Sequence, residues 1–330
     1  MANIKDVAQK TGLSIATISK YVNGKKIKPK NQILIDNAIA ELNYRPNLVA
    51  RGLKISKTMT IGILLPNLTS QFFPMVVTDL EKRLSKLGYN VIIANYNESS
   101  ELEESKFYNL LSRSVDGIIV APRSLPEKCI LEAEQRGVPV IFFDRLVKGI
   151  SVDAVVIDNY DILKKVAKRL IELGHKKIAL LAPEYSIYAI KERIRGGTDA
   201  IREAGLKEEL WLCGSDSASA YLVSKQKLEE EGPTAIIACS SSMTVGCLMA
   251  CIERGKKIPD DVSLVGFDNY TISSLVEPHI SMVYQPVSEI SENICDQIIS
   301  RIRSGKCGEN KIYIAKATFK ETPSIRLIKE

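Results

Sequence analysis

The stretch that decides the fold of the amino-terminal region reads Gly12-Leu13-Ser14-Ile15-Ala16-Thr17-Ile18-Ser19-Lys20-Tyr21-Val22-Asn23-Gly24. Ser14 is a residue type that caps a helix N-terminus and Gly24 one that ends a helix, so a short helix is expected between them. An earlier helix is expected to run from a cap at Asn3 to Gly12, where glycine favours left-handed backbone. Two short helices joined by a glycine-containing turn predict a helix-turn-helix.

A third helix is expected next, because Ile35, Ala38, Ile39 and Leu42 recur at the spacing that buries one stripe of a helix. This stripe can cover the backs of the first two helices. In the second helix, Ile18 and Val22 share the inward face. That leaves its other face, with Ile15, Ala16, Ser19 and Lys20, for a DNA major groove.

These exposed side chains suit base recognition. A lysine can donate to guanine O6 and N7, a serine hydroxyl can bond a base edge or a phosphate, and small apolar groups can contact a thymine methyl. The alternative for any one of them is an ordinary exposed helix residue.

Charge is concentrated at the same end of the chain. Residues 1–60 hold 11 lysines and arginines against 3 acidic residues, a net of +8, while residues 61–330 hold 34 against 36, a net of −2. A local cationic excess is what phosphate binding requires, because each neutralised phosphate releases counterions. The alternative is a solubilising tail, but this segment is not of low complexity.

The remaining residues alternate short apolar runs with helical patterns. Such runs are typical of strands buried on both faces, with helices as right-handed crossovers. We therefore expect two doubly wound α/β lobes with parallel sheets and a ligand cleft at the carboxyl ends of the strands. The expected strands are Ile61–Leu65, Val91–Ala94, Gly117–Ala121, Val138–Phe143, Ile178–Ala182, Ala235–Ala238 and Val262–Phe267.

Several classes of protein lack their usual signals. No dinucleotide-binding, Walker or nucleophile-elbow motif is present, and His175 and His279 lie at a helix end and in a loop, so no catalytic residue is expected. The seven cysteines contain no C-x-x-C pair, which argues against a metal site. No apolar run reaches bilayer length and no signal peptide is evident. A cytoplasmic protein without cofactor or membrane contact is expected.

The sequence resembles the LacI/GalR-type transcription regulators. The shared motifs are Ile4-Lys5-Asp6-Val7-Ala8, Gly12 to Ser19, Val22-Asn23-Gly24, Leu42-Asn43-Tyr44-Arg45-Pro46-Asn47, Ala50-Arg51-Gly52-Leu53, Val115 to Ile119, Asp144-Arg145, Val156 to Asn159, Pro233-Thr234-Ala235, Asp261 to Asn269 and Gln285-Pro286. They extend over essentially the whole chain.

The resemblance implies a helix-turn-helix domain at residues 1–46 and a hinge at 47–57 that orders only on DNA. There Leu53 would be wedged between base pairs in the minor groove, the alternative being a flexible linker. The residues expected to contact DNA are Ser14, Ile15, Ala16, Thr17, Ser19, Lys20, Asn23, Asn47, Ala50, Leu53 and Lys54.

For the body, the resemblance implies a periplasmic-binding-protein-like fold whose chain crosses between lobes near residues 159, 286 and 317. The first lobe would comprise 58–159 and 287–317, and the second 160–286 and 318–330. The residues expected to bind an effector in the cleft are Phe72, Phe73, Asp144, Arg145, Arg193, Ser240, Ser241 and Asp268. Core packing is the alternative for the phenylalanines, and a structural ion pair is the alternative for Asp144, Arg193 and Asp268.

Ser240 and Ser241 stand where relatives commonly carry Asn-Asp, which weakens a polar grip on a sugar. The ligand is therefore a sugar, a phosphorylated or non-carbohydrate molecule, or absent. The expected protein is a homodimeric regulator, most simply a repressor, that binds a pseudo-palindromic operator under control of a small molecule. The alternatives are a stand-alone sugar-binding or transport protein and an enzyme with an appended DNA-binding module.

Overall fold

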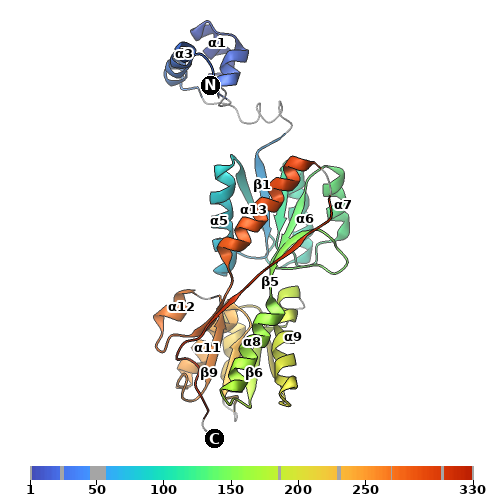
Figure 1. Ribbon diagram of the computed structural model, residues 1–330, viewed down its shortest axis with the longest axis vertical. Coiled ribbons are helices and arrows are strands. Elements are labelled where there is room, and N and C mark those ends of the chain that lie inside the picture. Colours follow the sequence, from blue (N-terminus) through green and yellow to red (C-terminus); the bar gives the residue numbers. More distant parts are fainter. Residues whose placement is uncertain are drawn as a thin grey trace. The chain divides into compact units, whose positions relative to one another are not determined.

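The structure is a computed structural model that describes residues 2–22, 26–44, 57–184, 187–228, 232–268, 270–305 and 308–328. It divides into two compact units, Met1–Met59 and Thr60–Glu330 (Figure 1). Within the described ranges, no helix is both long enough and apolar enough to cross a membrane.

The first unit contains the helices α1 (Ile4–Thr11), α2 (Ile15–Val22) and α3 (Pro29–Glu41). The Asn3 side chain accepts a hydrogen bond from the Lys5 N–H at 2.8 Å, and Asp6 accepts one from the Asn3 N–H at 2.7 Å. Gly12 follows α1 with φ 67°, a left-handed value that glycine adopts without strain. The predicted cap and end of this helix are confirmed.

One small core holds the three helices together. Val7, Ile18 and Ile35 are fully buried in it, one from each helix. Of the stripe predicted on the third helix, Ala38 is also buried, while Ile39 and Leu42 pack against the core and are partly buried. The predicted helix-turn-helix with a covering third helix is confirmed.

The first lobe of the second unit has a sheet in the order β11-β5-β4-β3-β1-β2, with every neighbouring pair parallel. Helices α5 (Phe72–Lys86) and α13 (Val287–Ser304) cover one face, and α6 (Ser100–Ser112) and α7 (Glu127–Gln135) cover the other (Figure 1). The strands are β1 (Thr60–Leu65), β2 (Asn90–Asn95), β3 (Gly117–Val120), β4 (Val140–Phe143), β5 (Asp153–Ile157) and β11 (Ile312–Ala315).

The second lobe repeats this arrangement with a sheet in the order β12-β10-β9-β8-β6-β7. Its strands are β6 (Ile178–Pro183), β7 (Glu209–Cys213), β8 (Ala235–Ala238), β9 (Ser263–Phe267), β10 (Ser281–Tyr284) and β12 (Thr318–Lys320). Its helices are α8 (Asn159–Glu172), α9 (Tyr188–Glu203), α10 (Ser217–Lys227), α11 (Ser241–Glu253) and α12 (Tyr270–Leu275). The pair α8 and α9 covers one face, and α10 and α11 cover the other.

Helices α8 and α9 approach closely because of a glycine. A Cβ on Gly196 would lie far inside van der Waals contact with the Tyr160 carbonyl oxygen. A Cβ on the neighbouring Gly197 would meet only the flexible end of Leu180, with its Cδ2 at 2.7 Å. Gly196 is therefore a packing requirement of this helix pair.

The chain passes between the two sheets from β5 to α8, from β10 to α13 and from β11 to β12. The last passage is short, since β11 ends at Ala315 and β12 begins at Thr318. The Asp158 side chain supports it by accepting a hydrogen bond from the Ala317 N–H at 2.8 Å.

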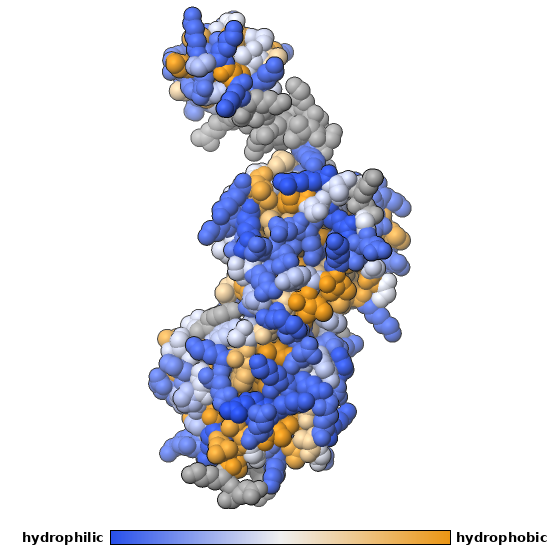
Figure 2. All heavy atoms as spheres, viewed as in Figure 1, coloured by the Kyte–Doolittle hydropathy of each residue, from blue (hydrophilic) through white to orange (hydrophobic). Residues whose placement is uncertain are grey.

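The two predicted parallel-sheet lobes are confirmed, but the sequence pattern missed strands both at the edges and inside the sheets. β12 pairs antiparallel with β10, whereas only parallel strands had been expected. β5, β7, β10, β11 and β12 were not among the expected strands. β7 has alternating burial and β11 is mostly exposed, so neither forms the continuous apolar run of a central strand. On the face shown in Figure 2, hydrophilic side chains predominate on both lobes, and smaller apolar patches lie among them.

Candidate functional site

The outward face of α2 is the first candidate site. Ser14 directly precedes the helix, and its Oγ accepts a hydrogen bond from the Thr17 N–H at 3.2 Å. Ile15 is 45% exposed, and Ala16 and Lys20 are also exposed. Ile15, Ala16 and Lys20 therefore share the exposed face of α2, whereas Ile18 on its opposite face is fully buried.

The other residues expected to contact DNA are placed less uniformly. Thr17 and Ser19 are partly buried, and Ser14 is exposed. Val22, expected to point inward, is partly buried and packs against the core of the unit. Asn23, Asn47, Ala50, Leu53 and Lys54, and with them the expected hinge helix, lie outside the described residues.

A tyrosine that the sequence analysis did not single out joins α2 to α3. Tyr21 Oη donates a hydrogen bond to Asp36 Oδ1 of α3 at 2.6 Å. This hydrogen bond, with a smaller contribution from burial, raises the pKa of Tyr21 above its ordinary value. Lys10 of α1 forms an ion pair with Glu41 of α3.

The second candidate site lies in the body, where the strands of both sheets end. In the first lobe Phe72 and Phe73 open α5 and are nearly buried. Their rings meet edge to face with centroids 5.3 Å apart, and Phe73 meets Phe143 at 6.0 Å in the same manner. Asp144 follows β4 with φ 61°, a left-handed conformation that costs energy in a residue other than glycine.

Beside Asp144 lies a buried ion network that the sequence analysis found only in part. Arg145 donates to Glu98 through two nitrogens, at 3.1 and 2.9 Å, and to Asp144 at 3.3 Å. Arg123 pairs with the same Glu98 at 3.2 Å. Burial alone would raise the pKa of Glu98, but Arg145 and Arg123 hold it below its ordinary value. Arg145 is therefore committed to internal partners.

In the second lobe Arg193 is 5% exposed and held on three sides. Its Nε donates to Asn159 Oδ1 at 2.7 Å, and its Nη1 donates to the Cys239 carbonyl at 2.9 Å. Its guanidinium stacks 3.7 Å from the centre of the Phe267 ring. Burial lowers the pKa of Arg193, opposed by the charges of Asp144 and Asp268. Asn159 and Phe267 belong to the site, although the sequence analysis did not place them there.

Asp268 follows β9 with φ 49° and is 4% exposed. Its Oδ1 accepts a hydrogen bond from the Gln285 N–H at 3.1 Å, and its Oδ2 accepts one from Gln285 Nε2. Burial raises its pKa to about 6, against the opposing effects of Arg193 and Gln285. Gln285 was noticed in the sequence only as part of a shared motif, because its partner lies 17 residues earlier in the chain.

The two serines lie at the start of α11 in the same lobe. Ser240 caps that helix, its Oγ accepting a hydrogen bond from the Met243 N–H at 3.4 Å, and Ser241 is its first residue. Both are partly buried. Part of the hydrogen-bonding capacity of Ser240 is thus used by the helix.

The two lobes interact across this region. Asp144 of the first lobe is close enough to Arg193 and Asp268 of the second to act on the pKa of each. Gln71, just before α5, donates a hydrogen bond to Thr271 Oγ1 of α12 at 3.0 Å. The region thus brings together buried carboxylates and a buried arginine from the two lobes, which are groups capable of hydrogen bonding to a polar ligand. In the described parts of the chain, no group of three or more His, Cys, Asp or Glu residues is placed to hold a metal ion.

Comparisons with known proteins agree with this division of the chain. Residues 3–47 match the family described as bacterial regulatory proteins, lacI family. Residues 58–322 match the family described as periplasmic binding proteins and sugar binding domain of LacI family.

Among curated proteins, the chain is similar to catabolite control protein A of Staphylococcus epidermidis, with 32% identity over 290 residues, 87% of this chain and 88% of the relative. It is 31% identical over 294 residues to the protein of that name from Priestia megaterium, again covering 87% and 88% of the two chains.

Among solved structures, the fold resembles the lac repressor dimer bound to operator and the anti-inducer ONPF, with a TM-score of 0.87, 23% identity and coverage of 98% and 99% of the two chains. It also resembles a LacI family transcriptional regulator from Enterococcus faecium with bound ribose, with a TM-score of 0.75, 26% identity and coverage of 82% and 100%. A transcription regulator CcpA of Lactococcus lactis has a TM-score of 0.72 at 24% identity, with coverage of 81% and 99%.

Proposed function

The chain belongs to the LacI family of bacterial transcription regulators, and we propose that it represses genes by binding a pseudo-palindromic operator as a homodimer. The observation that carries this proposal is the outward face of α2, where Ile15, Ala16 and Lys20 are exposed in a strongly cationic segment. A dimer is proposed because one helix-turn-helix covers too little DNA for tight, specific binding.

We propose that Ser14, Thr17, Ser19 and Asn23 add contacts to phosphates and base edges around these readers. For the hinge, the proposal is that Asn47, Ala50, Leu53 and Lys54 bind the minor groove, with Leu53 inserted between base pairs. The support is the match of residues 3–47 to the lacI regulatory family. That match also favours a regulator over a stand-alone binding or transport protein.

The body is proposed to bind a small, hydroxyl-rich molecule, a sugar or a related metabolite, between its two lobes. The proposed first lobe comprises residues 58–159 and 287–317, and the proposed second lobe comprises residues 160–286 and 318–330. Asp144 and Asp268 would accept hydrogen bonds from hydroxyls, and Arg193 would donate them. Phe72 and Phe73 would pack on an apolar face of the ligand, Arg145 would hold Asp144 in place, and Ser240 and Ser241 would contribute weaker polar contacts. Sugar binding is supported by the family that residues 58–322 match.

Ligand and DNA binding are coupled, in this proposal, through the relative angle of the two lobes. A ligand that binds one lobe arrangement better than another shifts the population toward it and changes operator affinity by that difference. We also propose that the protein acts in the cytoplasm without catalysing a reaction. The support is that its curated relatives are transcription regulators.

A gel-shift titration with the full-length protein tests the DNA-binding proposal. Fragments that flank its own gene are titrated at about 50 mM and about 200 mM salt, between which a phosphate-anchored interface loses affinity by orders of magnitude. Binding to no fragment at low salt, with or without ligands, would overturn the proposal. Affinity that did not change with salt would contradict the phosphate-anchored interface. A thermal-shift screen of sugars, sugar phosphates and purines tests the cleft, since a bound ligand raises the melting temperature with dose.

A further inference from the structure

One continuous segment of the chain, residues 311–320, forms an open edge on both sheets of the body (Figure 1). β11 is the last strand of the first sheet and β12 is the last strand of the second, and only two residues separate them. Among the described residues, no strand lies beyond either of them. The segment contains no residue assigned to the DNA interface or the effector site.

The backbone of β11 directs its polar groups alternately toward β5 and toward this open edge. The carbonyls of Lys311 and Ala315 accept hydrogen bonds from N–H groups of the β5 segment at 2.9 and 3.2 Å. Since successive residues of a strand face opposite ways, Tyr313, midway between them, also faces β5. The N–H and carbonyl groups of Ile312 and Ile314 therefore face outward.

Apolar side chains accompany this outward-facing backbone. Ile312 is 54% exposed and Ile314 is 53% exposed. Between them, Tyr313 is 36% exposed, and its Oη donates a hydrogen bond to Glu289 Oε1 of α13 at 2.7 Å. An edge strand that exposes both apolar side chains and its backbone groups is a template for pairing with another strand.

The charge of the segment is of one sign. Residues 311–320 include three lysines and no acidic residue. Lys316 pairs with Asp158 at 3.4 Å and with Asp161 at 3.8 Å. In the described part of the chain, Lys311 and Lys320 are exposed and have no ion-pair partner. These two lysines place positive charge at both ends of the edge, which complements an acidic partner.

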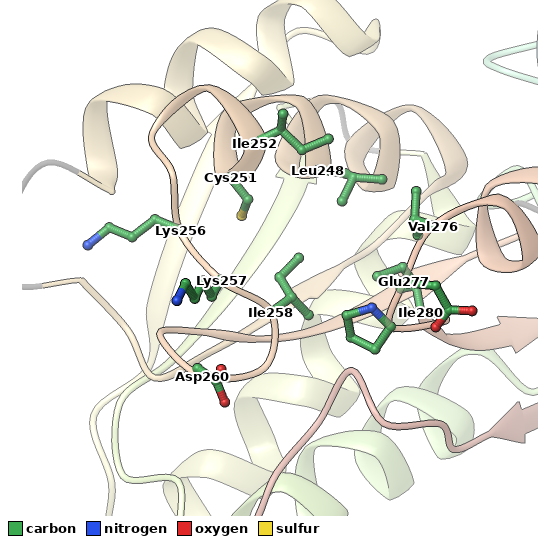
Figure 3. A pocket seen from close by; sticks show the side chains of 11 residues that line it. Leu248, Cys251, Ile252, Lys256, Lys257, Ile258, Asp260, Val276, Glu277 and Ile280 are labelled. Carbon is green, nitrogen blue, oxygen red and sulfur yellow. The ribbon is translucent and has the colours of Figure 1, made fainter.

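A cavity elsewhere on the body lacks such a preference. It has a volume of about 470 Å³, lies at the carboxyl-terminal end of α11 and is lined by apolar side chains such as Ile258 and Ile280. Figure 3 shows charged side chains of both signs around it, among them Lys257, Asp260 and Glu277. The charge of the cavity therefore does not select an occupant, whereas the charge of the edge does.

The lysines also disfavour pairing of this edge with a second copy of the chain. If two copies paired antiparallel about Tyr313, Lys311 of each copy would lie beside Lys316 of the other, at both ends of the pair. Like charges on neighbouring strands destabilise a sheet, and lysines on edge strands prevent such pairing. The occupant that fits is a different chain with acidic residues at its ends.

We propose that the edge formed by β11 and β12 binds an extended, acidic segment of another protein, which adds a strand to the first sheet. The backbone of Ile312 and Ile314 would exchange hydrogen bonds with that segment, and their side chains would pack on its apolar residues. Lys311 and Lys320 would pair with acidic residues at its two ends. Because the bound segment contacts both lobes, it can favour one lobe arrangement over another.

The test measures the fluorescence anisotropy of two labelled peptides with the full-length protein, without DNA or effector. Both peptides match residues 311–320 in length and alternate valine with threonine, but one carries aspartates at both ends and the other carries lysines. The acidic peptide should bind, and the amide hydrogen exchange of Ile312 and Ile314 should slow when it does. No binding up to millimolar concentration, equal binding of the two peptides, or protection only at other strands would overturn the proposal.

Ile314→Pro tests the outward-facing backbone. Proline removes the N–H that points away from β5 and leaves the bonds to β5, a position at which edge strands accept proline. The variant should keep its circular dichroism spectrum and bind the acidic peptide on the order of tenfold more weakly, because a peptide carbonyl loses its donor. Ile314→Thr keeps the N–H and the β-branched shape and should lose less. Equal losses in the two variants would overturn strand addition.

Lys311→Glu tests the charge at a side chain that is exposed, so the fold should not change. It should weaken binding of the acidic peptide and strengthen binding of the basic one. Ile252→Thr, at a 68% exposed isoleucine that lines the cavity of Figure 3, is the matched control and should change neither. An unchanged preference in Lys311→Glu would overturn recognition by charge. A dimer that dissociates in Ile314→Pro, measured by sedimentation, would assign the edge to a second copy and overturn the proposal.

Discussion

Asp144 and Asp268 occupy equivalent positions in the two lobes of the body. Each directly follows a strand at the same place in its sheet, β4 or β9, with left-handed backbone at φ 61° and 49°. Each also donates its N–H to a valine carbonyl on the next strand, Asp144 to Val155 at 3.0 Å and Asp268 to Val283 at 2.9 Å. The charges of both carboxylates raise the pKa of Arg193 against the effect of burial, Asp144 acting from the first lobe and Asp268 from the second.

Asp268→Asn should stabilise the ligand-free protein at pH 7. Burial raises the pKa of Asp268 from 3.8 to about 6, so folding favours the protonated form and ionisation costs stability as the pH rises through that interval. The amide removes this cost, a gain of roughly 1–3 kcal/mol at pH 7 that vanishes below about pH 4. Urea unfolding across this pH range measures it. The exposed Asp296→Asn is the control, and equal effects of the two changes would contradict the prediction.

Stability should fall as the pH drops below about 6.5 because of His175, whose unfolded pKa lies near that value. The ring is 1% exposed and lies 2.8 Å from Thr234 Oγ1 and 3.1 Å from the Arg326 carbonyl. Burial lowers its pKa, so the unfolded chain binds the proton more readily and acid favours unfolding.

His175→Gln should remove part of this acid sensitivity, since an uncharged amide can make similar hydrogen bonds. Melting temperatures between pH 5 and pH 8 provide the measurement. His279→Gln, at a side chain that is 51% exposed, is the matched control. An acid sensitivity that survives unchanged in His175→Gln would assign the effect to other groups.

Gly196→Ala should destabilise the body by about 1–3 kcal/mol, the usual cost of overpacking, even though alanine is the better helix former. Its Cβ would collide with the rigid Tyr160 carbonyl of α8. Gly197→Ala adds the same methyl group where only the end of Leu180 must move, and should cost less. Chemical denaturation of both variants gives the comparison. A larger loss in Gly197→Ala would show that the close approach of the helices is not what Gly196 provides.

Lys20→Ala should weaken operator binding by roughly tenfold, since a good lysine–guanine contact accounts for about 1–3 kcal/mol of discrimination. The melting temperature should not change, because this side chain is exposed. Lys10→Ala removes a lysine that is already paired with Glu41 and is the matched control. Titrations on specific and scrambled DNA distinguish base recognition from phosphate binding. An equal loss on both sequences would assign Lys20 to the phosphates.

Features encoded locally could be predicted from the sequence. A cap such as Asn3, a left-handed glycine such as Gly12 and a buried stripe around Ile35 depend on spacings of a few residues, and all three are present. Central strands such as β3 and β4 were found because they are buried on both faces and apolar throughout, whereas the interior strands β5 and β10 were missed.

Features that depend on tertiary contacts were missed. Glu98 lies 47 residues before its partner Arg145 in the chain. The two belong to one buried ion network because β2 and β4, which precede them, lie in the same sheet. The edge strand β7 alternates in burial, and nothing local distinguishes it from an amphipathic loop.

The two-residue passage from Ala315 to Thr318 has a mechanical consequence. A connection this short has almost no slack, so the lobes cannot slide past each other or separate along their long axis without breaking strand pairing. Rotation about an axis through the connecting segments is the remaining low-energy displacement. A small molecule that binds between the lobes is therefore expected to rotate one lobe against the other. A small rotation at the connecting segments moves the parts of each lobe farthest from them by a larger distance.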